Sequence, residues 1–241
     1  MDKYEQLKEL IKDAKRIVVF TGAGISVPSG IPDFRSANGL YNEKSKLNIP
    51  PERIISHSFF MSNTEDFYEF YKDKMMYLDA EPNIAHKYFA NLQNEKDVRI
   101  VTQNIDGLHE LAGSKYVYDI HGSIHRNYCM KCHRFYDAEF VKNSAGVPIC
   151  PTCGGLVKPD VVLYEEQLNY DTIERAITAI EKADLLIIIG TSLVVYPAAG
   201  FVNYFRGNNI VLINKSATSM DGYAKLVFSE DVVSVIERID K

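Results

Sequence analysis

The chain has 241 residues, of which 46% are hydrophobic and 24% charged, close to the average for globular proteins. This composition excludes a disordered chain, a collagen-like fibre and a small scaffold held together by disulfides. The net charge of -5 argues against a general nucleic-acid-binding protein, so we expect no nucleic-acid partner. The first residues are charged rather than apolar, so we expect no targeting segment, no membrane association and a cytoplasmic location.

Apolar residues recur at helical spacing between Tyr4 and Ala14, which predicts an amphipathic helix at the start of the chain. Short apolar runs predict buried strands at residues 17–20, 98–102, 116–120, 161–163, 185–189, 210–213 and 226–228. Helical patterns over residues 83–92, 172–182 and 232–239 lie between several of these runs. Apolar strands that alternate with helices predict an α/β fold, with a Rossmann-like, doubly wound parallel sheet covered on both faces.

Two segments interrupt this alternation. Residues 36–61 are polar and irregular in pattern, and residues 126–159 hold all four cysteines. We therefore predict a main domain of residues 1–35, 80–124 and 158–241, and a small helical and zinc-ribbon domain formed by two inserts, residues 36–79 and 125–157. The uncharged stretch from Leu185 to Phe205 is long enough to span a bilayer, but its glycines and proline favour a strand, a turn and a helix.

The cysteines form two pairs, Cys129-x-x-Cys132 and Cys150-x-x-Cys153, separated by 17 residues. Paired thiolates at this spacing predict a tetrahedral zinc site. Four thiolates fill the coordination sphere, so this zinc is structural. The nearby histidines His125 and His133 are not needed as ligands.

A glycine turn, Gly22-Ala23-Gly24, directly follows the first predicted strand. Such a turn lets the backbone approach a pyrophosphate, which the N-terminus of a following helix can favour. The usual dinucleotide fingerprint is incomplete, because Val27 stands where the third glycine would be and Glu43 is a poor candidate for the acidic ribose ligand. A tight structural turn explains the pattern almost equally well.

Polar residues follow three other predicted strands, where open α/β sheets bind ligands. These strand ends carry Gln103-Asn104-Ile105-Asp106, Asp119-Ile120-His121-Gly122 and Gly190-Thr191-Ser192. His121 is the best-placed general base of the six histidines. For Asp106 and for Thr191 with Ser192, helix capping is the alternative interpretation.

Together these motifs resemble the sirtuin family of NAD-dependent protein lysine deacylases. The resemblance rests on Gly22–Ser26, Ser29–Ser36, Thr102–Asp106, His121-Gly122, the four cysteines and Gly190–Leu193, and it extends from about Lys15 to Val232. It implies that NAD is a co-substrate, that acyl-lysine proteins or peptides are the substrates, and that the protein is a monomer. It also accounts for the incomplete fingerprint, because sirtuins bind NAD without the usual acidic ribose ligand.

The resemblance implies a role for each matching residue. It assigns catalysis to His121, as general base, and to Asn104. It assigns cofactor binding to Gly22, Ala23, Gly24, Ser26, Asp33, Phe34, Arg35, Gln103, Asn104, Ile105, Asp106, His121, Gly190, Thr191, Ser192, Asn214, Asp231 and Val232. It places the substrate peptide as an added strand between two loops, Val161-Val162-Leu163-Tyr164 and Leu193-Val194-Val195-Tyr196.

The implied reaction transfers the acyl group from lysine to ADP-ribose and releases nicotinamide. His121 then has to be neutral to accept a ribose hydroxyl proton, so activity is expected to fall below a pH of about 6.5 for an unperturbed histidine. Mono-ADP-ribosyl transfer from the same cofactor, and removal of other short acyl groups, are the alternative activities.

The sequence departs from the family pattern at several positions. Val27 replaces a usual threonine, Tyr41 replaces a tryptophan, and Tyr164-Glu165-Glu166 replaces Phe-Gly-Glu. One branch of the family binds acidic acyl groups through a Tyr-x-x-Arg motif, and the nearest match here is Tyr71-x-x-Lys74. Lysine lacks the bidentate fork of arginine. We therefore expect short neutral acyl groups, acetyl first.

Overall fold

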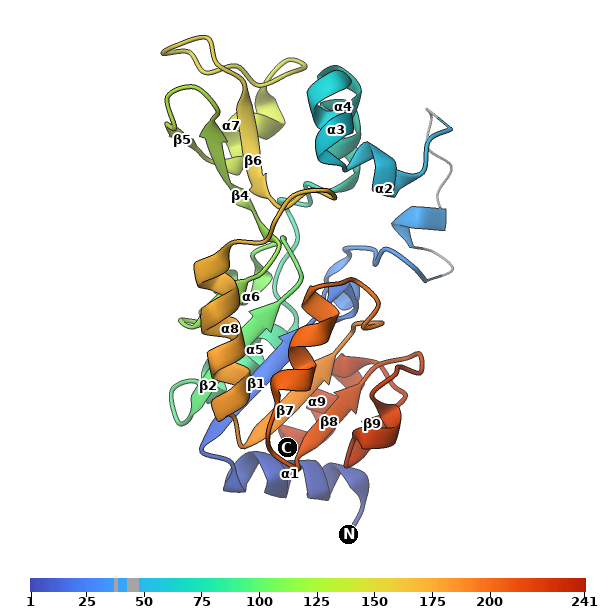
Figure 1. The fold of residues 1–241 in the computed structure, drawn as a ribbon. Coiled ribbons are helices and arrows are strands. Elements are labelled where there is room, and N and C mark those ends of the chain that lie inside the picture. The colour runs from blue at the N-terminus through green and yellow to red at the C-terminus, as the bar shows by residue number, and fades with distance from the viewer. Residues whose placement is uncertain (37–38, 43–47) are drawn as a thin grey trace.

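The computed structural model describes residues 1–36, 39–42 and 48–241. Its largest element is a six-stranded sheet with the order β3-β2-β1-β7-β8-β9 (Figure 1). The strands are β1 (Arg16–Thr21), β2 (Asp97–Thr102), β3 (Val117–Asp119), β7 (Leu185–Ile189), β8 (Ile210–Ile213) and β9 (Leu226–Phe228). Every neighbouring pair is parallel, so the predicted parallel sheet is confirmed.

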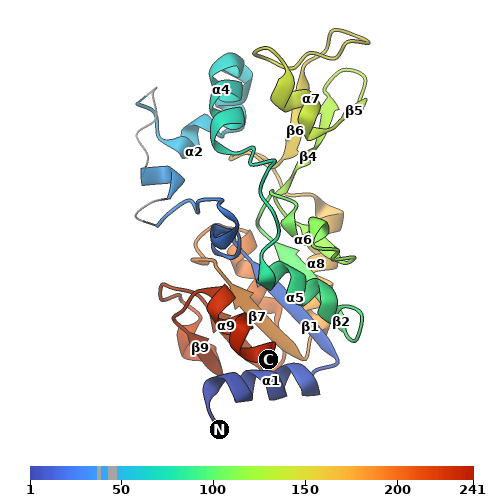
Figure 2. The same cartoon turned by 180° about the vertical axis from the view of Figure 1, so that it is seen from behind.

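Helices cover both faces of this sheet because successive side chains of each strand point to opposite faces. On one face, Ile17 and Val19 of β1 pack in a core with the helices α1 (Lys3–Asp13), α5 (Ile84–Leu92) and α9 (Val232–Ile239). On the other face, Val18 and Phe20 pack with α8 (Tyr170–Lys182) and the 3-10 helix η4 (Ala198–Tyr204). The two views in Figures 1 and 2 show these opposite layers.

A second, antiparallel sheet with the order β5-β4-β6 lies beyond the carboxyl ends of the main strands (Figure 1). It consists of β4 (Gly122–Cys129), β5 (Phe135–Tyr136) and β6 (Val157–Val161). The helices α2 (Pro51–Ile54), α3 (His57–Ser62), α4 (Thr64–Lys74) and α7 (Ala138–Asn143) belong to the same part of the molecule. Its own core contains fully buried aromatic rings from α3 and α4, namely Phe60, Phe67, Tyr68 and Tyr71.

The remaining short elements are α6 (Leu108–Leu111) and the 3-10 helices η1 (Ala23–Ile25), η2 (Val27–Ser29), η3 (Leu40–Asn42) and η5 (Asp221–Tyr223). Arg126 of β4 links the two sheets, because its guanidinium bonds Asp119 at the end of β3 (3.0 Å) and Asp160 in β6 (2.8 Å).

Two predictions about local structure need correction. The run at residues 161–163 does not form a strand of the main sheet: Val161 is the last residue of β6, in the antiparallel sheet. A short apolar run indicates burial but not which neighbour provides it. The segment predicted as irregular, residues 36–61, contains α2 and most of α3 in its described part.

The uncharged stretch at residues 185–205 forms β7 and η4, as its glycines and proline predicted. Among the described residues, no helix combines the length and the apolar character that crossing a membrane requires.

Candidate active site and metal centre

A cavity of about 670 Å³ lies where the carboxyl ends of β1, β2, β7 and β8 face the smaller part of the molecule. It gathers sixteen of the residues predicted to bind the cofactor. They are Gly22, Ala23, Gly24, Asp33, Phe34, Arg35, Gln103, Asn104, Ile105, His121, Gly190, Thr191, Ser192, Asn214, Asp231 and Val232. Such a volume suits a large organic ligand.

The glycine turn after β1 packs directly against the turn after β7. The Gly24 N–H donates to Gly190 O at 2.8 Å, and a Cβ on Gly24 would lie 2.5 Å from Gly190 Cα. Gly190 itself has φ +61°, a conformation that favours glycine. The second half of the turn is part of η1, and η2 follows, so no α-helix N-terminus follows this turn.

Ser26 and Asp106, both predicted to bind the cofactor, lie behind the cavity wall instead. The fully buried Ser26 donates through Oγ to Asp106 Oδ2 at 2.7 Å and accepts from Asn104 Nδ2 at 3.1 Å. Asp106 Oδ1 also accepts from the Leu108 N–H at the start of α6 (2.9 Å). Burial raises the pKa of Asp106, and these two hydrogen bonds oppose the rise. The network holds Asn104 in the cavity wall.

His121 follows β3 and lines the cavity. Its Nδ1 lies 2.9 Å from Gln103 O, and because a carbonyl can only accept, Nδ1 carries the proton. The other nitrogen, Nε2, then has the free lone pair of a base. Burial lowers the pKa of His121, although the hydrogen bond to Gln103 opposes this. The ring is therefore neutral at pH 7.

Thr191 uses its hydroxyl within the protein, because Oγ1 accepts from Gln103 Nε2 (2.9 Å) and from the Leu193 N–H (3.2 Å). This contact positions Gln103, while Ser192 is exposed. Neither residue caps a helix, because the next helix, η4, begins at Ala198 and has no side-chain cap. At the far end of the cavity, Asp231 caps α9 and pairs with Lys215 at 2.9 Å.

Several cavity residues were not predicted: Pro32, Ile55, Met75, Leu168, Lys215, Ser216 and Glu230. Lys215 and Ser216 follow Asn214 at the end of β8, so the strand-end rule that found the other sites would have included them. The departures Val27 and Tyr41 also line the cavity. Glu43, weighed as a ribose ligand, lies outside the described residues.

Only some residues of the two predicted peptide-binding loops line the cavity. Val161, Val162, Leu163, Tyr164, Val195 and Tyr196 line the cavity. Leu193 is buried in the main core and Val194 is exposed, and neither lines it. The N–H groups of Val162 and Tyr164 already donate to His121 O (2.9 Å) and Ile55 O (3.0 Å), so main-chain bonds to a peptide have to use other groups of the loops.

The four cysteines converge at one end of the antiparallel sheet, with all their Sγ atoms within 4.8 Å of one another. The Cys129–Cys153 and Cys132–Cys150 sulfur pairs are 3.4 and 3.7 Å apart. Zn–S bonds of about 2.3 Å place tetrahedral sulfurs about 3.8 Å apart, so the residues fit a zinc ion with four protein ligands. His125 instead bonds Asp106 O at 3.0 Å.

A strand-end cavity, together with a closed four-cysteine centre at the far end of the small sheet, defines a nucleotide-binding α/β enzyme with a structural zinc site. The chain matches the Sir2 family over residues 22–197. It is 54% identical over 241 residues to an NAD-dependent protein deacetylase of Clostridium acetobutylicum, with 99% of this chain and 98% of that protein covered. It is 57% identical over 240 residues to the protein of the same name from Clostridium perfringens, with the same coverage.

Solved structures give the same result. "Sir2-p53 peptide-NAD+" and "Sir2 bound to acetylated peptide" both align with a TM-score of 0.87, at 37% and 36% identity, covering 99% of this chain and 97% of theirs. The protein therefore belongs to the Sir2 family. The predicted fold, the enzyme class of NAD-dependent protein deacetylases, the co-substrate NAD and the structural zinc site are confirmed.

Proposed function

We propose that this chain deacetylates lysine side chains of proteins in the cavity between its two sheets, with His121 as general base. The main support is the contact between His121 Nδ1 and Gln103 O (2.9 Å), which leaves Nε2 in the cavity wall as an unprotonated nitrogen that can accept a proton. The strand-end turns around Gly22–Gly24 and Gly190–Ser192 bind the phosphates of NAD, and Asn214 with Asp231-Val232 binds the adenosine.

The residues act on different parts of the reaction. Asn104, held by Ser26, orients the nicotinamide end of NAD, which supplies the leaving group and the acceptor ribose. His121 accepts a proton from a ribose hydroxyl through Nε2, so that the hydroxyl oxygen can take the acetyl group. Apolar side chains around this point, including Phe34, Ile105 and Leu163, exclude competing water.

The acyl group is short and neutral. Tyr71 and Lys74 are the counterparts of the motif that binds acidic acyl groups. Neither is among the described residues that line the cavity. Tyr71 is fully buried in the core of the smaller part, and Lys74 pairs with Asp73 at 3.7 Å. A carboxylate on the acyl chain would therefore meet no cation from this pair.

The wider assignments are part of the same proposal. Residues 36–79 and 125–157 form the small domain, and the remaining residues form the NAD-binding domain. The protein is a cytoplasmic monomer that binds acyl-lysine proteins and no nucleic acid. Free thiols at the zinc site suit a reducing compartment, and a net charge of -5 disfavours nucleic acid.

The test is to incubate the protein with labelled NAD and an acetylated peptide. Deacetylation requires that nicotinamide release depends on the acetyl group. It also requires that His121→Ala lowers the rate of deacetylation about 100-fold or more while NAD still binds. Label transferred from NAD to protein, or undiminished turnover in His121→Ala, would overturn the proposal. Propionyl- and succinyl-peptides in parallel measure the acyl preference.

A further inference from the structure

The segment Leu163–Glu166, here called the peptide loop, is attached to the small-domain segment Ile55–Ser58. The Tyr164 N–H donates to Ile55 O (3.0 Å), and the His57 N–H donates to Tyr164 O (2.9 Å). These paired bonds form a short parallel bridge between Ser56 and Tyr164. The backbone of the peptide loop is therefore fixed on the small-domain side.

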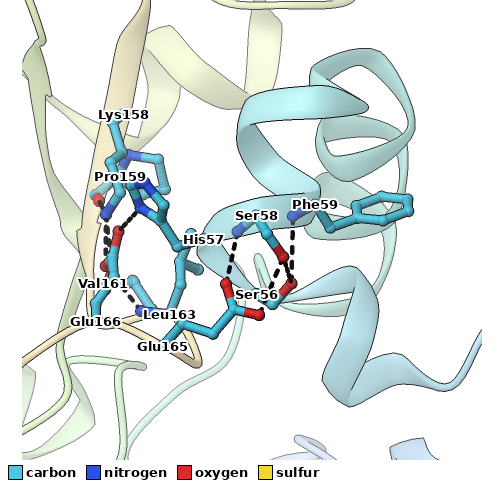
Figure 3. A network of polar contacts seen from close by, with 10 residues as sticks. All are labelled: Ser56, His57, Ser58, Phe59, Lys158, Pro159, Val161, Leu163, Glu165 and Glu166. Carbon is cyan, nitrogen blue, oxygen red and sulfur yellow. Dashed lines mark hydrogen bonds and ion pairs between the residues drawn. The ribbon is translucent and has the colours of Figure 1, made fainter.

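Side chains of the loop reinforce this attachment (Figure 3). Glu165 has φ +76°, a conformation that non-glycine residues rarely adopt. Its carboxylate accepts from the Ser58 N–H (2.8 Å) and the Ser58 hydroxyl (3.0 Å). Glu166 bonds His57 Nδ1 at 2.8 Å and Lys158 Nζ at 3.0 Å. The carboxylate of Glu165 thus compensates for its unfavourable backbone conformation.

On its other side the peptide loop is linked through Tyr41 to the cofactor loop, defined here as Asp33, Phe34 and Arg35. The hydroxyls of Tyr164 and Tyr41 are 2.8 Å apart. Tyr41 in turn donates its N–H to Phe34 O (2.9 Å) and packs its ring 5.4 Å from that of Phe34. The Arg35 guanidinium lies 5.2 Å from the centre of the Tyr41 ring.

In the described part of the chain, the hydroxyl pair joins the peptide loop to Tyr41, and Tyr41 in turn contacts the cofactor loop. Both residues line the cavity. Burial raises the pKa of Tyr41, so its phenol stays protonated and the bond persists throughout the neutral range. Because the backbone of the peptide loop is already held by the small domain, a ligand that orders the cofactor loop acts on the Tyr164 side chain through Tyr41, and the second ligand then loses less conformational freedom on binding.

We propose that the Tyr41–Tyr164 hydrogen bond couples the binding of NAD to the binding of the acyl-lysine peptide. The inference rests on the proposed function, because it takes the two loops as the NAD and peptide contacts. Tyr41 and Tyr164 are positioning residues: neither hydroxyl takes part in the chemistry. Coupling is reciprocal, so peptide raises the affinity for NAD by the same factor as NAD raises the affinity for peptide.

The test is a matrix of initial rates over both substrates, NAD and an acetyl-peptide, which yields the coupling factor between them. Tyr41→Phe, Tyr164→Phe and the double variant each remove only hydroxyl groups. Tyr223→Phe is the matched control, because Tyr223 is exposed on η5. A hydrogen bond of ordinary net strength predicts that each single variant lowers the coupling factor about twofold to tenfold.

The double variant should lower the factor no further than either single variant, since both lose the same bond. A coupling factor equal to that of Tyr223→Phe in both single variants, or single effects that multiply in the double variant, overturns the inference. In those cases acetyl-dependent nicotinamide release by the wild type still supports the proposed function. Loss of that release in the wild type refutes the function instead.

Discussion

Ser26→Ala should destabilise the protein and slow deacetylation, although Ser26 does not line the cavity. The substitution removes the 2.7 Å hydrogen bond to Asp106 Oδ2 and the acceptor for Asn104 Nδ2. A hydrogen bond to a charged group contributes about 1.5–3 kcal/mol. Asn104 is only half-buried and can turn to water, so its lost partner adds about 1 kcal/mol or less.

The combined loss of about 3 kcal/mol corresponds to a Tm lower by about 6–12 °C in a domain of this size. Urea unfolding followed by circular dichroism measures the change in free energy, and calorimetry measures Tm. Deacetylation should slow because Asn104 loses its orientation, while NAD binding, measured calorimetrically, changes less.

The pH dependence of this loss has a definite sign. Burial raises the pKa of Asp106 and the Ser26 bond opposes the rise, so the variant has a still higher folded pKa. A carboxyl group whose pKa is higher in the folded than in the unfolded protein destabilises the fold at pH values above its folded-state pKa. Below its unfolded-state pKa, about 3.9, it has no such effect. The difference between variant and wild type should therefore shrink as the pH falls towards 4.

Ser234→Ala on α9 is the control, since it replaces a half-buried serine in a helix and should leave Tm unchanged or slightly raised. A Ser26→Ala protein with wild-type Tm and wild-type turnover would refute the role given to this network.

Three further predictions concern the base, the zinc and the peptide loop. His121→Ala should lower the rate of deacetylation about 100-fold to 10,000-fold, while the affinity for NAD, measured by calorimetry, is retained. Because burial lowers the pKa of His121, the acid limb of the wild-type pH–rate profile should lie below pH 6.5, and a midpoint above pH 7 would contradict this. Cys150→Ser should lose the bound zinc, measured by metal analysis, and make the zinc ribbon sensitive to protease, because structural zinc contributes folding free energy; a full zinc content would exclude the four-cysteine site. Glu165→Ala should raise KM for acetyl-peptide about threefold to tenfold and leave KM for NAD unchanged, because it loses the Ser58 contacts but keeps the unfavourable φ. Glu165→Gly relaxes that φ and should raise KM for acetyl-peptide less. Equal KM values in the two variants and the wild type would contradict the anchoring role.

Local patterns were sufficient for much of the fold. The central strands β1, β7 and β8 are apolar on both faces, so they appear as continuous apolar runs, and the helices between the strands keep a period of 3.6 residues. The cysteine spacing likewise predicts the zinc site, because each Cys-x-x-Cys pair places two thiolates close together by its local backbone geometry. The family motifs lie in the strand-end turns, where the sequence has to satisfy backbone geometry and ligand chemistry together.

The sequence by itself therefore determined the parallel sheet, the four-cysteine centre and the family. The tertiary structure decided that Val161 ends a strand of the small sheet, that Ser26 and Asp106 stand behind the cavity wall, and that Leu193 is buried. It also decided that Tyr41 and Tyr164, 123 positions apart, share a hydrogen bond. Periodicity reports whether a side chain is buried, but the identity of its neighbour depends on how distant segments pack, which no local pattern contains.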